Sequence, residues 1–370
     1  MWRNNSWYST TCTGGQEDAA SIQSLPCGPG KPIDARSLLH GGSTLSDSSQ
    51  FARHASPTEE SHAELPVVAV VIVHWINMAD TVECLESLSG VDYPNMLVVV
   101  VNNGSKDFDG KRLRESCPSA LVVTSAENLG VTRGNNLGVD AALASGADMI
   151  LFLNPDTIVR SDLIQSLLPA FLDRRVGVVG PVITYYDNPG VVWSAGGRYD
   201  RLVGHPRTLH LDAPLTSVCE TREVDWLSCC AMMATRDMLE EAGPFWEDLF
   251  MYFDDSEFCL RVRRAGYKCV AVGKPLVLHK VSAAGGIRGS NRFSSDKAYY
   301  FGRNPFLVFR RHPGGLWIIP SVMSQFVVVL PYMSVRNGLA KSGRLMASYL
   351  CGMWDGIRGR RGKRGRTVRS

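Results

Sequence analysis

The chain has 370 residues, of which 45% are hydrophobic, and its formal net charge is +3. A chain of this size can bury one large core or two moderate ones, so an enzyme fits, whereas so small a charge argues against nucleic acid as a partner. The ten cysteines form no Cys-x-x-Cys pair, and the polar first residues lack the apolar core of a secretory signal. We therefore expect reduced thiols and a cytoplasmic location.

Residues 1–64 are rich in Ser, Thr, Gly and Pro and contain few apolar runs. Such a composition buries too little surface to offset the entropy lost on ordering, which predicts a disordered extension. Apolar runs begin directly afterwards and recur to about residue 311. We assign one globular domain to residues 65–311 and a separate C-terminal region to residues 312–370.

Two apolar runs open the domain, at residues 67–73 and 96–101, and the segment between them has helical spacing. Asp80 and Glu83 suit a capping box at the start of that helix. Polar residues follow both runs: Asn77 after the first, and Asn102, Asn103 and Gly104 after the second. Parallel strands joined by a right-handed crossover open on the same edge of a sheet, so these polar residues should meet there.

A third run, at residues 120–123, precedes a loop and helix rich in glycines and amides, including Asn128, Gly130, Gly134 and Asn135. Glycines let backbone amides approach a phosphate, and a helix N-terminus offers unpaired N–H groups to an anion. A glycine-rich loop alone is a weak signal. The loop is thus a candidate contact for a phosphate.

The run at residues 149–153 has no helical period and ends in Asn154, Pro155 and Asp156. Five large apolar residues in a row predict a strand buried on both faces. Pro155 cannot continue a central strand, so Asp156 should stand at the carboxyl edge of the sheet, where open α/β folds bind ligands. The alternative is an ordinary turn that ends the strand. A helix should follow, with Ser161 as its cap.

Three acids, Asp254, Asp255 and Glu257, follow the aromatic run at residues 250–253. Hydrophobic spacing and Gly266 predict a helix over residues 255–265 with acids in its first turn. Favourable charges at a helix N-terminus explain the acids about as well as a function does. The aromatic run, however, places them beside the sheet, and a partly desolvated carboxylate suits a catalytic base.

Other residues have two interpretations. His279 ends the second of two short strands predicted at residues 268–272 and 275–279; imidazole is a common metal ligand, although a packed surface histidine is the more frequent case. The adjacent Cys229 and Cys230 suit a redox or metal pair, but without other ligands they are better explained as small core residues.

The alternation of apolar runs and helical segments predicts an α/β fold with a mainly parallel central sheet that forms a nucleotide-binding layer.

Residues 316–335 are mostly apolar, but two prolines and several polar groups weaken the case for a membrane span. Apolar residues then recur at helical spacing, opposite a polar face, and a basic tail follows: Leu345, Met346, Tyr349, Leu350, Met353 and Trp354, against Lys341, Arg344, Ser348 and Asp355. Such a helix would lie on an anionic membrane; a packed helical extension and a transmembrane span are the alternatives.

Several of these segments, in this order, resemble the family 2 glycosyltransferases, in particular their rhamnosyltransferase-like branch with the GT-A fold. The resemblance covers roughly residues 67–310 and includes the strand at 70–77, the nucleotide segment at 99–107, Glu-Asn-Leu-Gly at 127–130, Asn-Pro-Asp-Thr at 154–157, Ser-Ala-Gly-Gly at 194–197, the acidic helix at 252–261, and the Tyr and Arg-Asn residues at 299–304. The chain departs from the pattern at Asn102, where many relatives have aspartate, and at Cys229, where glycine is usual.

The resemblance implies an inverting transfer of a sugar from a nucleotide-sugar donor to a hydroxyl. Asp255 would be the catalytic base, and Asp156 with His279 would hold Mg²⁺ or Mn²⁺. The donor contacts it implies are Asn77, Asn102, Asn103, Gly104, Asn128, Gly130, Gly134, Asn135 and Asn154. The acceptor contacts it implies are Trp226, Asp254 and Glu257.

The resemblance further implies a donor such as dTDP-rhamnose or a UDP-sugar, and a glycan or lipid-linked acceptor used in cell-surface polysaccharide assembly at the inner face of the cell membrane. Two alternatives stay open. A sugar nucleotidyltransferase would need a basic glycine-rich signature near the start of the domain, which residues 74–77 do not supply. A nucleotide-sugar binding or scaffold protein without catalysis is supported only by Asn102 and Cys229.

Overall fold

The computed structural model describes residues 65–199, 206–218, 220–281, 294–312 and 339–365, together with the single positions 324, 327 and 331. The extension predicted for residues 1–64 lies outside the described residues, as do nearly all of residues 316–335 and the end of the basic tail.

The helices and strands alternate along most of the described chain. In chain order they are β1 (Val68–His74), α1 (Met78–Ser89), β2 (Met96–Asn103), α2 (Gly110–Ser116), β3 (Leu121–Ser125), α3 (Gly130–Ala144), β4 (Met149–Leu153), β5 (Thr157–Val159), α4 (Leu163–Leu167), η1 (Leu168–Leu172), β6 (Val176–Tyr185), β7 (Val192–Ser194), β8 (Gly197–Tyr199), β9 (Pro206–Thr208), η2 (Leu215–Ser217), β10 (Arg222–Val224), β11 (Ala231–Thr235), α5 (Arg236–Ala242), η3 (Glu247–Leu249), α6 (Asp254–Arg264), β12 (Lys268–His279), α7 (Ser295–Arg311) and α10 (Leu339–Ile357).

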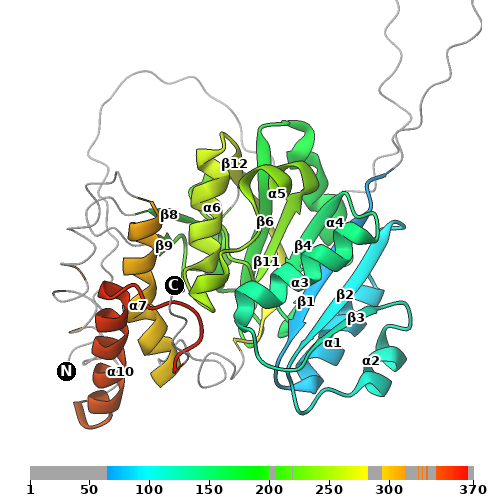
Figure 1. Ribbon diagram of the computed structural model, residues 1–370. Coiled ribbons are helices and arrows are strands. Elements are labelled where there is room, and N and C mark those ends of the chain that lie inside the picture. Colours follow the sequence, from blue (N-terminus) through cyan, green and yellow to red (C-terminus); the bar gives the residue numbers. More distant parts are fainter. Residues whose placement is uncertain are drawn as a thin grey trace, which may run out of the picture. The chain divides into compact units, whose positions relative to one another are not determined.

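One large sheet organises these elements (Figure 1). Its strand order is β10-β12-β6-β11-β4-β1-β2-β3, with β5 added to β12 and β7 to β6. Strand β1 is parallel to both β2 and β4, and β2 is parallel to β3, so the predicted β-α-β unit is present. Strand β11 runs antiparallel to both of its neighbours, β4 and β6. The fold is thus of the predicted α/β class, and its sheet is mixed.

The sheet has helices on both faces because successive side chains of a strand point in opposite directions. On β1, Val68, Val70 and Ile72 belong to a core that includes the apolar face of α1. Ala69 and Val71 belong to a second core, which includes residues of α3, α5 and α6. The two cores pack helices against both faces of the sheet, and this packing fixes the positions of the strand ends at its carboxyl edge.

The start of α1 differs from the predicted capping box. The helix begins at Met78, and its N-terminal amides bind a carboxylate from another loop: Asp107 Oδ2 accepts from the Asn77 N–H at 2.8 Å and the Met78 N–H at 3.3 Å. Asp80 and Glu83 instead bind the ammonium group of Lys280, directly after β12. The capping-box prediction was wrong because partners distant in sequence bind these acids.

Two further local predictions were wrong. Residues 268–279 form one strand, β12, with register irregularities around Gly273 where two strands were expected. The helix after Asp156 is the short α4, which has no side-chain cap, and Ser161 precedes its N-cap Asp162. Helix α4 passes directly into the 3₁₀ helix η1 at Pro169, whose ring removes a backbone donor.

Helices α7 and α10 pack side by side and form the C-terminal part of the described chain (Figure 1). Glycines make this contact close. A Cβ added at Gly302 would lie 2.4 Å from the Tyr349 carbonyl oxygen, and one at Gly352 would lie 2.0 Å from the Tyr299 carbonyl oxygen. Among the described residues, no helix is long and apolar enough to cross a membrane.

Candidate active site

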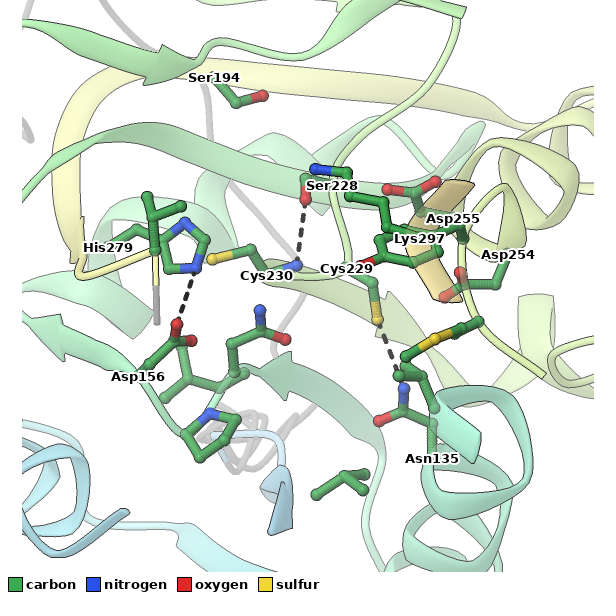
Figure 2. A pocket seen from close by; sticks show the side chains of 18 of the residues that line it. Asn135, Asp156, Ser194, Ser228, Cys229, Cys230, Asp254, Asp255, His279 and Lys297 are labelled. Atoms are coloured by element: carbon green, nitrogen blue, oxygen red, sulfur yellow. Dashed lines mark hydrogen bonds and ion pairs between the residues drawn. The ribbon is translucent and has the colours of Figure 1, made fainter. Parts of the chain in front are cut away.

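A cavity of about 580 Å³ opens at the carboxyl ends of the parallel strands β1, β2 and β4. Its wall combines the segments that follow these strands with residues 251–256 before and within α6, and with residues of α7. Asp156 and Asp255 both line the cavity, at different places along its wall (Figure 2). The volume is within the range of roughly 300 to 1,000 Å³ that is common for small-ligand sites.

Asp156 lies where the chain turns from β4 into β5. Strand β5 pairs with β12 so that Thr157 lies opposite His279, which brings the histidine to the aspartate. Asp156 Oδ2 is 3.3 Å from His279 Nε2, and both side chains are buried (Figure 2). Burial lowers the pKa of His279, but Cys230 and Asp156 outweigh it and raise that pKa well above the ordinary value of 6.5. The two groups form an ion pair, and a bound cation would have to replace the imidazolium proton between them.

The pair suits a divalent cation that is shared with a substrate. Carboxylate oxygen and imidazole nitrogen are ligands of Mn²⁺, and Mg²⁺ is commonly held by one or two carboxylates together with substrate phosphates. Within the described part of the chain, no three His, Cys, Asp or Glu side chains form a metal site by themselves. His279 Nδ1 is buried without a hydrogen-bond partner, which is rare for a polar atom. These residues therefore fit a cation whose remaining ligands come from a diphosphate and water.

The second acidic site is the first turn of α6. Asp254 is buried, and the Ser256 N–H donates to Asp255 Oδ1 at 2.7 Å. Burial and, second, the charge of Asp254 raise the pKa of Asp255 well above its ordinary value of 3.8. Burial also raises the pKa of Asp254. A carboxylate with a raised pKa at a cavity wall is suited to accept a proton.

Most of the predicted donor residues line the cavity, but three do not. The ones that line it are Asn77, Asn103, Asn128, Gly130, Asn135 and Asn154. Asn102, Gly104 and Gly134 are outside the lining and have internal partners instead. Asn102 Oδ1 accepts from the Ser105 N–H at 3.0 Å, a Cβ on Gly104 would meet the Glu127 backbone at 2.2 Å, and one on Gly134 would meet Val73 at 2.7 Å.

The backbone N–H groups at the start of α3 donate to other groups of the same chain and are therefore not free to bind a phosphate. The Val131 N–H donates to the Phe250 carbonyl at 2.7 Å, and the Gly130 N–H to Asn128 Oδ1 at 2.8 Å. Gly130 has φ +87°, and a Cβ there would lie 2.3 Å from the same Phe250 oxygen. The glycine therefore serves a close backbone contact, and the prediction that the α3 amides are unpaired was wrong. No local pattern indicates this contact, because Phe250 lies 120 positions after Gly130.

Of the predicted acceptor residues, Trp226 and Asp254 line the cavity and Glu257 does not. Glu257 is fully buried and paired: its Oε1 lies 3.0 Å from Arg261 Nε, 3.0 Å from His312 Nε2 and 3.5 Å from Arg311 Nε. These partners lower the pKa of Glu257 against the effect of burial. Glu257 thus anchors α6 to the end of α7, and we do not carry it into the proposed acceptor site.

Two residues that the sequence did not single out, Trp193 and Lys297, also line the cavity. Trp193, like the predicted Trp226, has a buried indole N–H without a hydrogen-bond partner. Lys297 belongs to α7, and its ammonium group lies 5.7 Å from the Tyr252 ring. Trp193 lies in a turn-rich stretch without periodicity, and Lys297 lies after the acidic helix, so no local pattern marked either of them.

The fold is of the GT-A type. The structure is similar to the mannosyltransferase PcManGT from Pyrobaculum calidifontis, solved in complex with GDP-Man and Mn²⁺, with a TM-score of 0.50 and 15% identity over 79% of this chain and 87% of that chain. It is also similar to GalNAc-T7 with UDP, GalNAc and Mn²⁺, with a TM-score of 0.50 over 64% of this chain and 48% of that one. At these identities the likeness concerns the fold.

The chain belongs to the glycosyltransferase-like family 2, whose model matches residues 66–293. It is 26% identical over 304 residues to an N-acetylglucosaminyl-diphospho-decaprenol L-rhamnosyltransferase of Mycobacterium tuberculosis, covering 76% of this chain and 95% of the relative. It is 24% identical over 270 residues to the dTDP-rhamnosyl transferase RfbF of Shigella flexneri, covering 72% and 87%. The rhamnosyltransferase-like resemblance is thus confirmed, and the chain is a glycosyltransferase of glycan biosynthesis.

Proposed function

We propose that the chain transfers rhamnose or a related hexose from a nucleotide-sugar donor to a hydroxyl of a glycan or lipid-linked acceptor, with inversion at the anomeric carbon. The observation that carries the proposal is that Asp156 and Asp255, 99 positions apart in sequence, line one cavity. The rhamnosyltransferase names of the Mycobacterium and Shigella relatives support the sugar, and the diphospho-decaprenol in the former name supports a lipid-linked acceptor.

In this proposal Asp255 accepts the proton of the acceptor hydroxyl as its oxygen attacks the anomeric carbon. The bond from that carbon to the donor phosphate breaks on the opposite side, and the nucleoside diphosphate leaves with the bonding electrons. One base is enough because the diphosphate leaves without needing a proton. The raised pKa of Asp255 favours the transfer of the proton to it.

Asp156 and His279 would hold Mg²⁺ or Mn²⁺ on the donor side of the cavity. When bound, such a cation offsets the negative charge that develops on a leaving diphosphate. Asn77, Asn103, Asn128, Asn135 and Asn154 supply neutral hydrogen-bonding groups along the same wall, suited to a nucleoside and its sugar. Trp226 and Asp254 would contact the acceptor.

A panel of nucleotide sugars with an added lipid-diphosphate glycan acceptor tests the proposal. We expect dTDP-rhamnose or a UDP-sugar to raise the melting temperature, more so with Mn²⁺, since a ligand at about one hundred times its Kd stabilises the native state by about 2.7 kcal/mol. The same donor should give glycosylated acceptor and free nucleoside diphosphate. Release of pyrophosphate from a nucleoside triphosphate and a sugar phosphate would indicate a nucleotidyltransferase, and donor binding without turnover would indicate a binding protein.

The rate of transfer should rise with pH through the raised pKa of Asp255, because only the ionised carboxylate accepts a proton. The charge of Asp254 is one of the two main causes of that raised pKa. Replacing Asp254 with asparagine removes the charge, so the acidic limb of the kcat profile should move to lower pH. Profiles of the wild type and Asp254→Asn at the same ionic strength check this. Superimposable acidic limbs would contradict the proposed coupling of the two acids.

We further propose that α10 contacts an anionic membrane surface, with the enzyme on the cytoplasmic side. Only part of the apolar face that was predicted for this helix is exposed and could contact lipid. Tyr349 and Met353 pack against α7, and Asp355 is buried as well, so they cannot meet lipid. Leu350, Trp354 and Ile357 are 44%, 54% and 45% exposed and recur at helical spacing. The exposed side chains of Arg344 and Arg358 flank this stripe and would meet anionic headgroups.

Flotation with vesicles of anionic or neutral lipid tests the membrane contact. The full chain should float with anionic vesicles, and replacing Leu350 and Trp354 with serine should release it, since each interfacial apolar side chain contributes through its buried area. Leu172→Ser is the matched control, because Leu172 is 86% exposed and belongs to η1, outside the stripe. Equal flotation of all three proteins would exclude the stripe as the contact.

A further inference from the structure

The loop that carries the acids of α6 has an unusual backbone. Phe250, Tyr252 and Phe253 have φ values of +66°, +63° and +62°, in the left-handed region that residues with a side chain rarely adopt. Each such residue costs about 1 to 2 kcal/mol, and the conformation persists only where the surroundings hold it. We call residues 248–253 the aromatic loop. It leads directly into Asp254 and Asp255.

Donors from outside the aromatic loop bind five successive carbonyl groups in it. The Asn304 side-chain amide donates to the carbonyls of Met251 and Tyr252, each at 2.8 Å. The α3 amides donate to the Phe250 carbonyl, as described above. Arg303 Nη2 donates to the Leu249 carbonyl at 2.8 Å and to the Asp248 carbonyl at 3.3 Å. The loop conformation is therefore imposed by its partners.

Arg303 is itself held by the segment after α10. Its side chain is only 1% exposed, its guanidinium lies 4.8 Å from the Tyr300 ring centroid, and Nη1 donates to the Gly362 carbonyl. The Gly362 N–H donates to the Asp248 carbonyl at 2.8 Å, so this one residue binds both the loop and the arginine. Its φ of +74° suits glycine and turns both backbone groups toward these partners.

Side chains around Gly362 add further contacts with the same region. Arg361 Nη1 lies 3.2 Å from Asp248 Oδ2, and the Arg364 N–H donates to the Tyr300 hydroxyl at 2.9 Å. Lys363 Nζ donates to the Asn128 carbonyl at 3.5 Å. Arg361, Lys363 and Arg364 of the basic tail thus contact residues of the domain at 65–311. We call residues 360–364 the C-terminal strap.

We propose that the C-terminal strap, acting through Gly362 and Arg303, positions the aromatic loop and thereby sets the place of Asp255 in the cavity. The strap is thus a positioning element of the active site, and none of its residues lines the cavity. The proposal rests on the proposed role of Asp255 for its kinetic consequence. Its structural part, that the strap orders the loop, is independent of the reaction.

Two matched proline substitutions in the full chain distinguish loss of the Gly362 contact from a general effect of proline in the tail. Gly362→Pro removes the N–H that binds Asp248 and cannot adopt φ +74°, whereas Gly365→Pro changes a glycine with φ +85° whose Cβ would meet nothing within 4 Å. We expect amide hydrogens of residues 250–256 to exchange about fivefold faster in Gly362→Pro, the effect of losing a hydrogen bond worth roughly 1 kcal/mol. Gly365→Pro should match the wild type.

The kinetic readout is the division of the effect between kcat and KM. We expect Gly362→Pro to lower kcat by about tenfold to a hundredfold, as for a misplaced catalytic group, with little change in the KM for the donor. An equal loss of donor affinity, or equal values for the two proline variants, would overturn the positioning role. If Gly362→Pro does not yield folded protein, Gly362→Ala with Gly365→Ala as control keeps the N–H and tests the requirement for φ +74° with milder strain.

The two proposals fail in different ways. A wild-type chain that transfers no sugar contradicts the proposed function, and the exchange rates of the loop amides still test the strap. Unchanged exchange in Gly362→Pro, in an enzyme that transfers sugar normally, overturns the strap and leaves the role of Asp255 intact.

Discussion

Asp255→Asn should lower kcat by about two to four orders of magnitude, the usual contribution of a general base. Asparagine keeps the size of the side chain and its acceptor for the Ser256 N–H, but it cannot accept the proton of the acceptor hydroxyl. Donor binding should be spared, because Asp255 belongs to α6 and the asparagines along the donor wall remain in place. Initial rates at saturating acceptor, with donor binding measured separately by calorimetry, check both parts.

The control for this substitution is Asp237→Asn. Asp237 is also an acid in the first turn of a helix, but it belongs to α5, is exposed and is outside the cavity. Its replacement should leave kcat within a factor of about two, as expected for a surface change of roughly 0.5 kcal/mol or less. If Asp255→Asn retains the wild-type kcat, another group accepts the proton and the assignment is wrong.

Asp156→Ala should abolish the metal-dependent part of donor binding and lower kcat/KM by about three orders of magnitude, since charge stabilisation by a bound cation is worth several kcal/mol. The substitution removes the carboxylate of the ion pair and leaves His279 as the sole protein ligand proposed for the cation. Thermal shifts with the donor should then be the same with and without Mn²⁺. Direct Mn²⁺ binding, followed by paramagnetic resonance with donor present, gives a readout that does not depend on turnover.

Asp187→Ala is the corresponding control, because Asp187 is an exposed acid near the end of β6 and does not line the cavity. It should keep the metal-dependent shift. A Mn²⁺-dependent shift that survives in Asp156→Ala would place the cation elsewhere and remove Asp156 from the proposed site.

Local sequence patterns predicted the features that depend on adjacent residues. The apolar run before Asn154 fixed strand β4 and therefore the place of Asp156, because a parallel strand must end at the edge of the sheet. The aromatic run and the acids predicted the start of α6 to within one residue. These parts of the cavity follow from strand and helix periodicity alone.

The predictions that failed concern residues whose partners lie far away in sequence. Glu257 has the same local setting as Asp255, but His312 and Arg311 arrive from the end of α7 and enclose it. Gly130 stands where a phosphate-binding glycine would, yet the Phe250 carbonyl occupies its approach. Charge and periodicity do not encode which distant group reaches a given side chain.

The contacts of Phe250 have a consequence for engineering. Its backbone closes on Gly130, and its ring stacks on Tyr300 with centroids 5.3 Å apart. If only the segment that carries the acids is exchanged between relatives, the new side chain at position 250 would have to pack against the original Gly130 and Tyr300. These contacts fit only if all three positions come from the same relative. Libraries intended to change the acceptor should recombine residues 127–131, 248–255 and 299–304 as a single block.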